Sequence, residues 1–347
     1  MGARTMRAAV FKGPGLIDVE ERPDPRPEPG GVVVEVSHCG ICGTDLHLLL
    51  EGWGRPGLVA GHEYSGRIAS VGPGVDGWSV GDPVAVDPQL ACGECPQCLV
   101  GRPSLCRTRD ASAAMHGEGA FATFTRVAAG QLHRVPEALD LRSAALTEPL
   151  AVALHAVTLS NLGAASSGAR ALVTGAGPIG VLVVAALRAM GVDDVTVSEP
   201  ADARRAAALA IGARTAVVPD ELPATPPMPD GVVEGAYDAV VECSGRADVT
   251  EHALGLLAPA GTLVITGTGL QRPRIDQMRI LLNELVVTGS YNYDADGFER
   301  ALALLASGAV PGDRIVEADD VTLHEIVPAL ESLARGERAG KVLVRPN

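Results

Sequence analysis

The sequence predicts an α/β protein that combines a doubly wound parallel sheet with a second, β-rich domain. Its length of 347 residues predicts about two domains. Strand-and-turn patterns fill residues 6–135, and from residue 141 strands alternate with helices, which is typical of a parallel sheet. Hydrophobic residues make up 47% of the chain but aromatic residues only 3%, so Ala, Val and Leu build the cores.

The first part of the chain is predicted to consist of strands and turns. Residues 6–36 contain short strands interrupted by the proline-rich stretch ERPDPRPEPGG. Residues 60–135 contain β patterns such as EYSGRIASVGPGV and GDPVAVDP, in which glycine and proline mark the turns. Residues 141–162, LRSAALTEPLAVALHAVTLSNL, are predicted to form a helix.

The second part follows a strand–helix–strand order. Residues 171–191 are predicted to form a strand, a glycine turn and a helix. Further strands are expected at VTVSE, YDAVVECSG, GTLVITG and LVVTGSY, and helices at ADARRAAALAIG and TEHALGLLA. Residues 218–235 are too rich in proline for a long helix. The C-terminal part is predicted to contain two helices, GFERALALLASG and HEIVPALESLARG, followed by the strand KVLVRP.

Charge and hydropathy argue against two kinds of partner. The net charge is −14 and the pI about 5.0, so the chain repels nucleic acids and anionic membranes. The longest apolar run, VLVVAALRAM, is too short to span a bilayer and contains Arg188. No export signal is readable at the N-terminus and the thiols are expected to be free, so we expect a cytoplasmic protein.

Four of the seven cysteines gather in the stretch LACGECPQCLVGRPSLC. They are Cys92, Cys95, Cys98 and Cys106. Their spacing, C-x2-C-x2-C-x7-C, lacks the short third gap and the following proline of a four-iron cluster motif. Disulfides across two-residue gaps would be strained, whereas four thiolates that close a tetrahedron favour zinc. Since four protein ligands leave no position for a substrate, we predict a structural zinc site here.

A glycine turn predicts a nucleotide site. Gly175, Gly177 and Gly180 lie between a predicted strand and a predicted helix, where they permit a tight turn, the approach of a pyrophosphate and close helix packing. Pro178 and Ile179 begin the helix, whose free N–H groups face the phosphates. Glu199 ends the next strand, where an acid binds the adenosine ribose and repels a 2′-phosphate. We therefore expect NAD, although Arg204 and Arg205 follow within one helical turn.

A second set of metal-binding residue types lies earlier in the chain. HCGICGTDLH supplies Cys42, and GHE supplies His62 and Glu63. Glu148 offers a further oxygen ligand. A mixed cysteine, histidine and carboxylate set leaves a coordination position for water or substrate, so this set predicts a catalytic zinc.

These motifs together resemble the zinc-dependent medium-chain dehydrogenase/reductase family. GHEYSGRIASVGPGV, GDPVAV, the four-cysteine stretch and the glycine turn follow one another in that family's order over essentially the whole chain. The resemblance implies a GroES-like catalytic domain at 1–150 and 291–347 and a Rossmann domain at 151–290, with the active site between them. It also implies two zinc ions per chain, NAD, a small alcohol substrate, and assembly into a homodimer or homotetramer.

Within the family, TEPLAVALHA resembles the sorbitol and butanediol dehydrogenase branch, and ICGTDLH also resembles threonine dehydrogenase. The resemblance assigns Cys42 and His62 as direct ligands, and Glu63 and Glu148 as direct, water-bridged or exchanging ligands. Asn292 stands where the polyol branch has an arginine, which argues against a sorbitol-like substrate. We expect a secondary alcohol, polyol or cyclitol-like substrate, with L-threonine as the alternative, and a non-catalytic NAD-binding scaffold as the competing class.

Zinc as a Lewis acid favours ionisation of the substrate hydroxyl, which then transfers hydride to the nicotinamide. The resemblance implies that Thr44 accepts the proton and that His47 passes it to solvent. Asp45 is expected to orient His62, because metal-bound histidines usually donate their other N–H to a carboxylate. Cys39 and Cys243, on apolar segments, are expected to be inert buried thiols.

Overall fold

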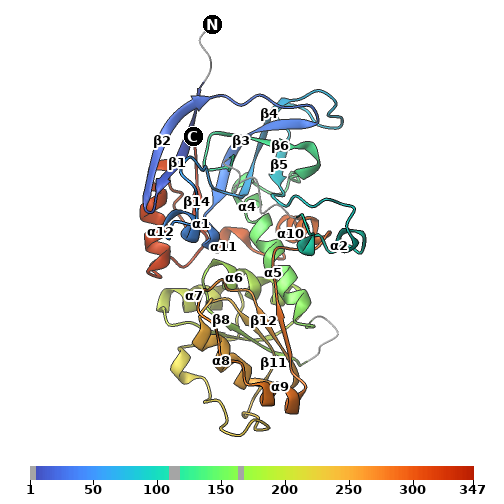
Figure 1. Cartoon of the computed structure of the whole chain (residues 1–347), viewed down its shortest axis with the longest axis vertical. Helices are drawn as coiled ribbons and strands as arrows, with labels where there is room; N and C mark the ends of the chain where they lie inside the picture. Colours follow the sequence, from blue (N-terminus) through green and yellow to red (C-terminus); the bar gives the residue numbers. More distant parts are fainter. Residues whose placement is uncertain (1–4, 109–117, 163–167) are drawn as a thin grey trace. The chain divides into compact units, whose positions relative to one another are not determined.

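The computed structural model describes residues 5–108, 118–162 and 168–347, and its chain divides into two compact units (Figure 1). Unit 1 contains Met1–Glu148, Asp294–Gly308 and Val316–Asn347. Unit 2 contains Pro149–Tyr293 and Ala309–Ile315. Each unit has a sheet of six strands, and one is antiparallel whereas the other is parallel.

Unit 1 is the β-rich unit. Its sheet has the order β14-β3-β4-β5-β7 with β6 paired to β3, and a separate hairpin joins β1 to β2. The strands are β1 (Thr5–Gly13), β2 (Leu16–Pro23), β3 (Gly31–Gly40), β4 (Glu63–Val71), β5 (Pro83–Val86), β6 (Phe124–Ala128), β7 (Leu132–Arg134) and β14 (Leu343–Val344). β14 pairs with the end of β3, with Leu343 opposite Gly40, so the C-terminus completes a sheet begun near the N-terminus.

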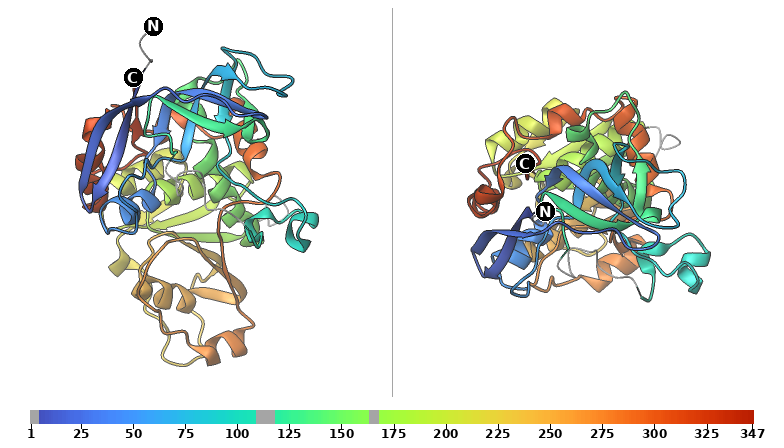
Figure 2. Two further views of the ribbon diagram at one scale, coloured as in Figure 1. Left: turned by 45° about the horizontal axis from the view of Figure 1, so that its top comes forward. Right: turned by 90° about the horizontal axis from the view of Figure 1, so that it is seen from above.

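Unit 1 also contains short helices. They are α1 (Gly43–Leu49), α2 (Pro96–Leu99), α4 (Leu141–Ala144), α10 (Gly297–Ala306) and α12 (Ile326–Ala334), with 3-10 turns at Pro103–Leu105, Ala129–Gln131 and Leu323–Glu325. In Figures 1 and 2, α12 (red) lies beside α1 and the β1–β2 hairpin (blue). Buried Phe11, Leu49 and Leu330 belong to one core, so α1 is fixed from both ends of the chain.

Unit 2 contains the predicted parallel sheet. Its order, β10-β9-β8-β11-β12-β13, places the first strand in the middle and builds outward in both directions. This is the doubly wound arrangement, in which ligands bind at the carboxyl ends of the strands. The strands are β8 (Arg170–Thr174), β9 (Asp194–Ser198), β10 (Thr215–Val217), β11 (Tyr237–Glu242), β12 (Leu257–Ile265) and β13 (Val286–Gly289).

The predicted α/β alternation of unit 2 is present. Its helices are α5 (Thr147–Leu159), which begins in unit 1, α6 (Pro178–Ala189), α7 (Asp202–Ile211), α8 (Ala247–Gly255), α9 (Gln277–Asn283) and α11 (Gly312–Ile315). The proline-rich stretch after β10 forms only a 3-10 turn at Pro219–Glu221, as its composition predicts. No helix within the described residues has the length and apolar content needed to cross a membrane.

Three details differ from the sequence prediction. The helix expected at 141–162 is two helices, α4 and α5, because the chain turns at Ala145–Leu146. The segment Ala309–Ile315 belongs to unit 2 rather than to the domain expected at 291–347, because α11 lies against α6 and α7. The short helices α1 and α9 had no predicted counterpart.

Candidate active site and metal centres

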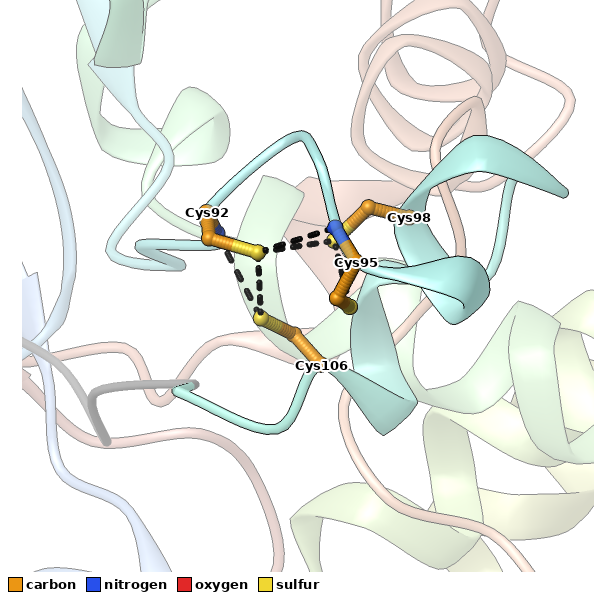
Figure 3. A group of neighbouring side chains, drawn as sticks. All are labelled: Cys92, Cys95, Cys98 and Cys106. Carbon is orange, nitrogen blue, oxygen red and sulfur yellow. Dashed lines mark hydrogen bonds between the residues drawn. The ribbon is translucent and has the colours of Figure 1, made fainter.

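The four predicted zinc-binding cysteines converge in unit 1. One sulfur from each of Cys92, Cys95, Cys98 and Cys106 lies within 4.8 Å of all the others (Figure 3). Backbone N–H groups point at two of them: Cys95 N–H donates to Cys92 Sγ at 3.3 Å, and Cys92 N–H donates to Cys106 Sγ at 3.4 Å. Such donors favour thiolates, and the Cys92 amide lowers the pKa of Cys106 to about 6. The donor set and its spacing fit a tetrahedral structural zinc.

This four-cysteine lobe is tied to a distant part of unit 1. Ser104 Oγ donates to Asp294 Oδ1 at 2.7 Å, and Arg102 Nε donates to Asp294 Oδ2 at 3.3 Å.

Burial raises the pKa of Cys98 to about 12, so this sulfur would need a metal to become a thiolate near neutral pH. All four sulfurs face one another, which leaves no open ligand position.

A second cluster combines three different donor types. Donor atoms of Cys42, His62 and Glu63 lie within 4.8 Å of one another. Cys42 precedes α1, and its N–H donates to Asp45 Oδ2 at 2.9 Å. Glu63 is the first residue of β4, opposite Gly40 at the end of β3, and His62 directly precedes it. At the facing position, Gly40 leaves room for Glu63, because a Cβ there would lie 2.2 Å from Glu63 Oε2.

The electrostatics of this second cluster suit a cation. Burial, together with the negative charge of Glu63, raises the pKa of Cys42. Burial opposes protonation of His62, but the charges of Asp45, Glu148 and Glu63 outweigh it and raise the pKa of His62. Buried His62 Nδ1 and Asp45 Oδ1 have no hydrogen-bond partner among the residues that the structure describes. A buried nitrogen without a partner and a thiol among carboxylates fit a zinc site.

Glu63 has a partner that the sequence analysis did not find. Lys341 Nζ donates to Glu63 Oε1 at 2.7 Å and to Oε2 at 2.6 Å, and their side chains are 1% and 0% exposed. Lys341 Nζ also donates to the Ile41 carbonyl at 3.1 Å, directly before Cys42. The only sequence signal was a lysine directly before the apolar run VLV in the predicted strand KVLVRP, one of two lysines in the chain.

Glu148 is buried at the start of α5. Its donor atoms are not among those that group with Cys42, His62 and Glu63 in the described part of the chain. Its charge nevertheless acts on both Cys42 and His62, and burial raises its own pKa to about 8.

The two predicted proton-relay residues lie on α1. Cys42 Sγ is 3.6 Å from Thr44 Oγ1, so this hydroxyl faces the Cys42 thiol. One helical turn further along α1, His47 Nδ1 lies 2.8 Å from Glu51 Oε2, and the imidazole stacks on Trp53. Asp45, predicted to orient His62, has one oxygen committed to Cys42 N–H and one without a partner.

The glycine turn connects β8 to α6 in unit 2. Gly175 has φ +88° and a Cβ there would lie 3.1 Å from Ser244 N, so only glycine fits without strain. A Cβ on Gly180 would lie 1.9 Å from the Gly175 carbonyl oxygen, so helix and turn pack in direct contact. No atom lies within 4 Å of a Cβ built on Gly177, which leaves this position open for a pyrophosphate. Pro178 and Ile179 are the first residues of α6.

Glu199 directly follows β9 and is 4% exposed. Its carboxylate accepts hydrogen bonds from Ala176 N–H at 2.8 Å and from Ala201 N–H at 2.9 Å. Glu199 therefore connects the glycine turn to the next strand, a structural role that the sequence did not show. Arg205 donates to the Glu199 and Pro200 carbonyls at 2.7 Å each and pairs with Asp202. Arg204 lies on the same helix, α7.

The glycine turn and the cluster of Cys42, His62 and Glu63 have complementary chemistry. A glycine turn at the carboxyl end of a parallel strand binds a dinucleotide, and an open metal site activates a hydroxyl. This combination defines the class of zinc-dependent, nicotinamide-dependent dehydrogenases. Family models agree: "Alcohol dehydrogenase GroES-like domain" matches residues 28–137 and "Zinc-binding dehydrogenase" matches residues 178–307. The chain belongs to the zinc-dependent medium-chain dehydrogenase/reductase family.

Curated relatives cover almost the whole chain. A 2-dehydro-3-deoxy-L-galactonate 5-dehydrogenase of Pseudoalteromonas atlantica is 36% identical over 88% of this chain and 89% of its own. A sorbitol dehydrogenase of Bacillus subtilis is 31% identical over 99% and 98%. An L-threonine 3-dehydrogenase of Pyrococcus abyssi is 32% identical over 97% of each chain.

Solved structures show the same fold. An alcohol dehydrogenase of Escherichia coli CFT073, complexed with NADH, has a TM-score of 0.88 at 27% identity and covers 99% of this chain and 100% of its own. A zinc-binding dehydrogenase of Sinorhizobium meliloti, bound to NADP, has a TM-score of 0.86 at 34% identity with the same coverage. The chain is therefore an oxidoreductase that acts on CH–OH groups of small alcohols, and the hypothesis of a non-catalytic scaffold is not supported.

Proposed function

We propose that this enzyme transfers hydride from a secondary hydroxyl of a polyol or sugar-acid-like substrate to NAD. The observation that carries the proposal is the grouping of Cys42, His62 and Glu63 donor atoms within 4.8 Å, separate from the four-cysteine lobe. The cluster of Cys42, His62 and Glu63 offers a substrate position, and the four-cysteine lobe does not. The named relatives that act on sugar acids and polyols support this substrate class.

Cys42 and His62 would hold the catalytic zinc, with Glu63 and Glu148 as further oxygen donors that bind directly, through water or in exchange. Bound there, zinc supplies Lewis-acid polarisation of the substrate hydroxyl. Lys341 balances the charge of Glu63, so the remaining negative charge near Cys42 comes from Asp45 and Glu148. Asp45 orients this end of α1 through its hydrogen bond with Cys42 N–H.

The substrate proton would pass through α1. Thr44 Oγ1, close to the metal-binding thiol, accepts it first, and His47 at the end of α1 passes it to solvent. The distance of 3.6 Å between Cys42 Sγ and Thr44 Oγ1 supports this order, because it places the hydroxyl beside the metal ligands.

The cofactor is proposed to be NAD rather than NADP. Glu199 lies next to the glycine turn and has a negative charge that repels a 2′-phosphate. The nearby guanidinium of Arg205 is occupied by two carbonyls and by Asp202. Neighbouring structures contain both NADH and NADP, so the residues of this chain decide the preference.

L-Threonine 3-dehydrogenase activity is the second candidate, because ICGTDLH and the relative from Pyrococcus abyssi favour it. A panel of secondary alcohols, polyols, sugar acids, aminocyclitols and threonine, read by NADH absorbance, separates the two. Activity on threonine alone would replace the proposed substrate class.

Variants test the catalytic assignment on one active alcohol. Cys42→Ser and His62→Ala should abolish oxidation while NADH still binds, and Thr44→Ala should be nearly as severe. His47→Gln should lower kcat less, within the roughly 10²–10⁴-fold range of one acid–base group, and the loss should shrink at high pH where hydroxide collects the proton.

Elemental analysis should find two zinc ions per chain, and Cys92→Ser should remove one while harming folding more than chemistry.

We infer that two copies of the chain pair through unit 2. The strand β13 is one of the two edges of the parallel sheet, and within the described residues 8 of the 18 exposed large hydrophobic side chains lie in residues 270–291. An edge strand is self-complementary about a two-fold axis, so a second copy covers both the strand and the apolar side chains. Leu281→Lys should convert a dimer to a monomer in light scattering, whereas Leu209→Lys, on exposed α7, should not.

We place the enzyme in the cytoplasm. All seven cysteines are free in the structure, and the eight ligands proposed for the two zinc sites include five of these thiols, which need reducing surroundings. Cell fractionation with an activity assay tests this placement, and recovery in an oxidising compartment would contradict it.

A further inference from the structure

His47 is held from two sides at the end of α1. Its Nδ1 lies 2.8 Å from Glu51 Oε2, one helical turn further along the chain. Its ring stacks on Trp53, with 4.6 Å between ring centroids and 16° between the planes. The His47 side chain is 17% exposed, whereas that of Glu51 is 49% exposed. The imidazole is thus covered, and its carboxylate partner reaches out to solvent.

Local sequence explains this arrangement. α1 ends at Leu49, and Gly52, with φ +81°, reverses the chain direction where other residues would be strained. The backbone N–H of Trp53 then donates to the His47 carbonyl at 3.1 Å, and this hydrogen bond places the indole ring against the imidazole. Spacing of four residues places Glu51 on the same side as His47.

We propose that Glu51 and Trp53 are positioning residues that present His47 Nε2 as the proton-accepting nitrogen. An ionised carboxylate can only accept a hydrogen bond, so its contact with Nδ1 requires a proton on Nδ1. The neutral imidazole therefore has its lone pair on Nε2. Stacking on Trp53 fixes the plane of the ring, and with it the direction in which Nε2 points.

This inference rests on the proposed role of His47 as the outer relay group. A relay histidine works only if the nitrogen facing the incoming proton is unprotonated, as an acid partner ensures in other catalytic histidines. Within the described residues, the Glu51 carboxylate pairs with His47 Nδ1 and not with the proposed zinc ligands or the glycine turn, so it acts through His47.

Three substitutions of Glu51 test whether an acceptor-only carboxylate is needed beside His47 Nδ1. Glu51→Ala removes the acceptor, so both tautomers become populated, and kcat should fall roughly 3–10-fold, less than for loss of the acid–base group itself. Glu51→Gln replaces the acceptor-only carboxylate by an amide that can also donate to Nδ1, so the tautomer is no longer fixed and kcat should fall as in Glu51→Ala. Glu51→Asp should recover part of the loss. KM for the alcohol should change little in all three, because no substrate contact is removed.

The chain offers a matched control in His133. Its Nδ1 lies 3.9 Å from Glu299 Oε1, and its ring lies 4.6 Å from that of Phe298. Glu299→Ala therefore removes an exposed carboxylate from a histidine that also contacts an aromatic ring. It should leave kcat and its pH dependence unchanged.

¹⁵N NMR of histidine-labelled enzyme reads the tautomer without any assay, and His47→Gln assigns the signal. We expect a protonated Nδ1 and an unprotonated Nε2 in the parent and in Glu51→Asp, and a mixture of tautomers in Glu51→Ala and Glu51→Gln. The opposite tautomer in the parent would overturn the inference, and so would unchanged kcat in Glu51→Ala while His47→Gln is impaired. If His47→Gln is fully active at every pH, the proposed relay role of His47 is wrong. The tautomer measured by NMR then shows separately whether the inference about Glu51 holds.

Discussion

At the scale of single residues, the pair of Glu63 and Lys341 shows what a sequence does and does not reveal. Cysteine and histidine spacings identified Cys42 and His62, because ligand types and motifs are local. Lys341 is 278 residues from Glu63, and only the pairing of β14 with β3 brings the two together. The same limit applies to Glu199, whose predicted position was local but whose bond to Ala176 depends on how β8 and β9 pair.

Removing Lys341 should leave a buried carboxylate without a partner. Both side chains are almost completely buried, so Lys341→Met should lower the free energy of unfolding by about 3–5 kcal/mol. Lys341→Met combined with Glu63→Gln removes both charges and should recover most of that loss. Urea unfolding followed by circular dichroism measures both effects.

The other lysine of the chain is the control. Lys12 pairs with Glu20 at the surface, with side chains 33% and 34% exposed. Lys12→Met should change the free energy of unfolding by less than about 1 kcal/mol. Equal effects of Lys341→Met and Lys12→Met would contradict the buried pair.

Glu199 should set cofactor preference through both its charge and its hydrogen bonds. Glu199→Ser removes the repulsion of a 2′-phosphate and should narrow or invert the ratio of kcat/KM for NAD to that for NADP. Because the bond to Ala176 N–H is lost as well, KM for NAD should also rise. Glu199→Asp, which keeps the charge, should retain the NAD preference. Equal or better kcat/KM with NADP in the unmodified enzyme would reject the assignment.

At the scale of elements, the period of the hydrophobic residues and the glycine and proline residues at turns predicted the long helices and strands well. The longer strands and helices of unit 2 are where the alternation placed them, because a repeated hydrophobic pattern averages over many residues, whereas the three-residue strand β10 was not predicted. Short elements were missed. The helices α1 and α9 have seven residues each, too few for a helical period, and they are held by Asp45 and Asp276 at their first turns.

Asp140 also begins a helix, and its effect should depend on pH. Its Oδ1 accepts from Ser143 N–H at 2.8 Å and its Oδ2 from Ser143 Oγ at 3.0 Å, at the N-cap of α4. Burial opposes ionisation, but the Ser143 hydrogen bonds outweigh it and lower the pKa of Asp140 below its ordinary value of 3.8. The stabilisation is therefore fully present above pH 3.8 and is lost as pH falls through the lower, folded-state pKa.

Asp140→Ala should lower the free energy of unfolding by about 1 kcal/mol at neutral pH. The difference from the parent should shrink in acid, below pH 3.8, where both lack the ionised cap. Urea unfolding at several pH values measures this difference. A difference that stays constant into acid would mean that the carboxylate does not cap α4.

At the scale of the whole molecule, the two units separate the two chemistries. Every proposed zinc ligand lies in unit 1, which spans Met1–Glu148 and two later segments, and the glycine turn lies in unit 2. Each unit has its own hydrophobic core, which includes Phe11 and Leu330 in unit 1 and Leu172 and Leu263 in unit 2. Ligands that bind mainly one unit should therefore stabilise that unit more than the other.

The two tryptophans make this testable, because Trp53 and Trp78 both lie in unit 1. Tryptophan fluorescence then follows the unfolding of unit 1, whereas much of the circular dichroism comes from α6, α7 and α8 in unit 2. NAD at 100 times its Kd contributes about 2.7 kcal/mol and should raise the dichroism midpoint by about 5–10 °C, and the fluorescence midpoint by less. A zinc chelator should do the reverse and lower the fluorescence midpoint more. If both probes shift equally with both treatments, the units unfold as one cooperative body, and the assignment of one ligand class to each unit loses its thermodynamic support.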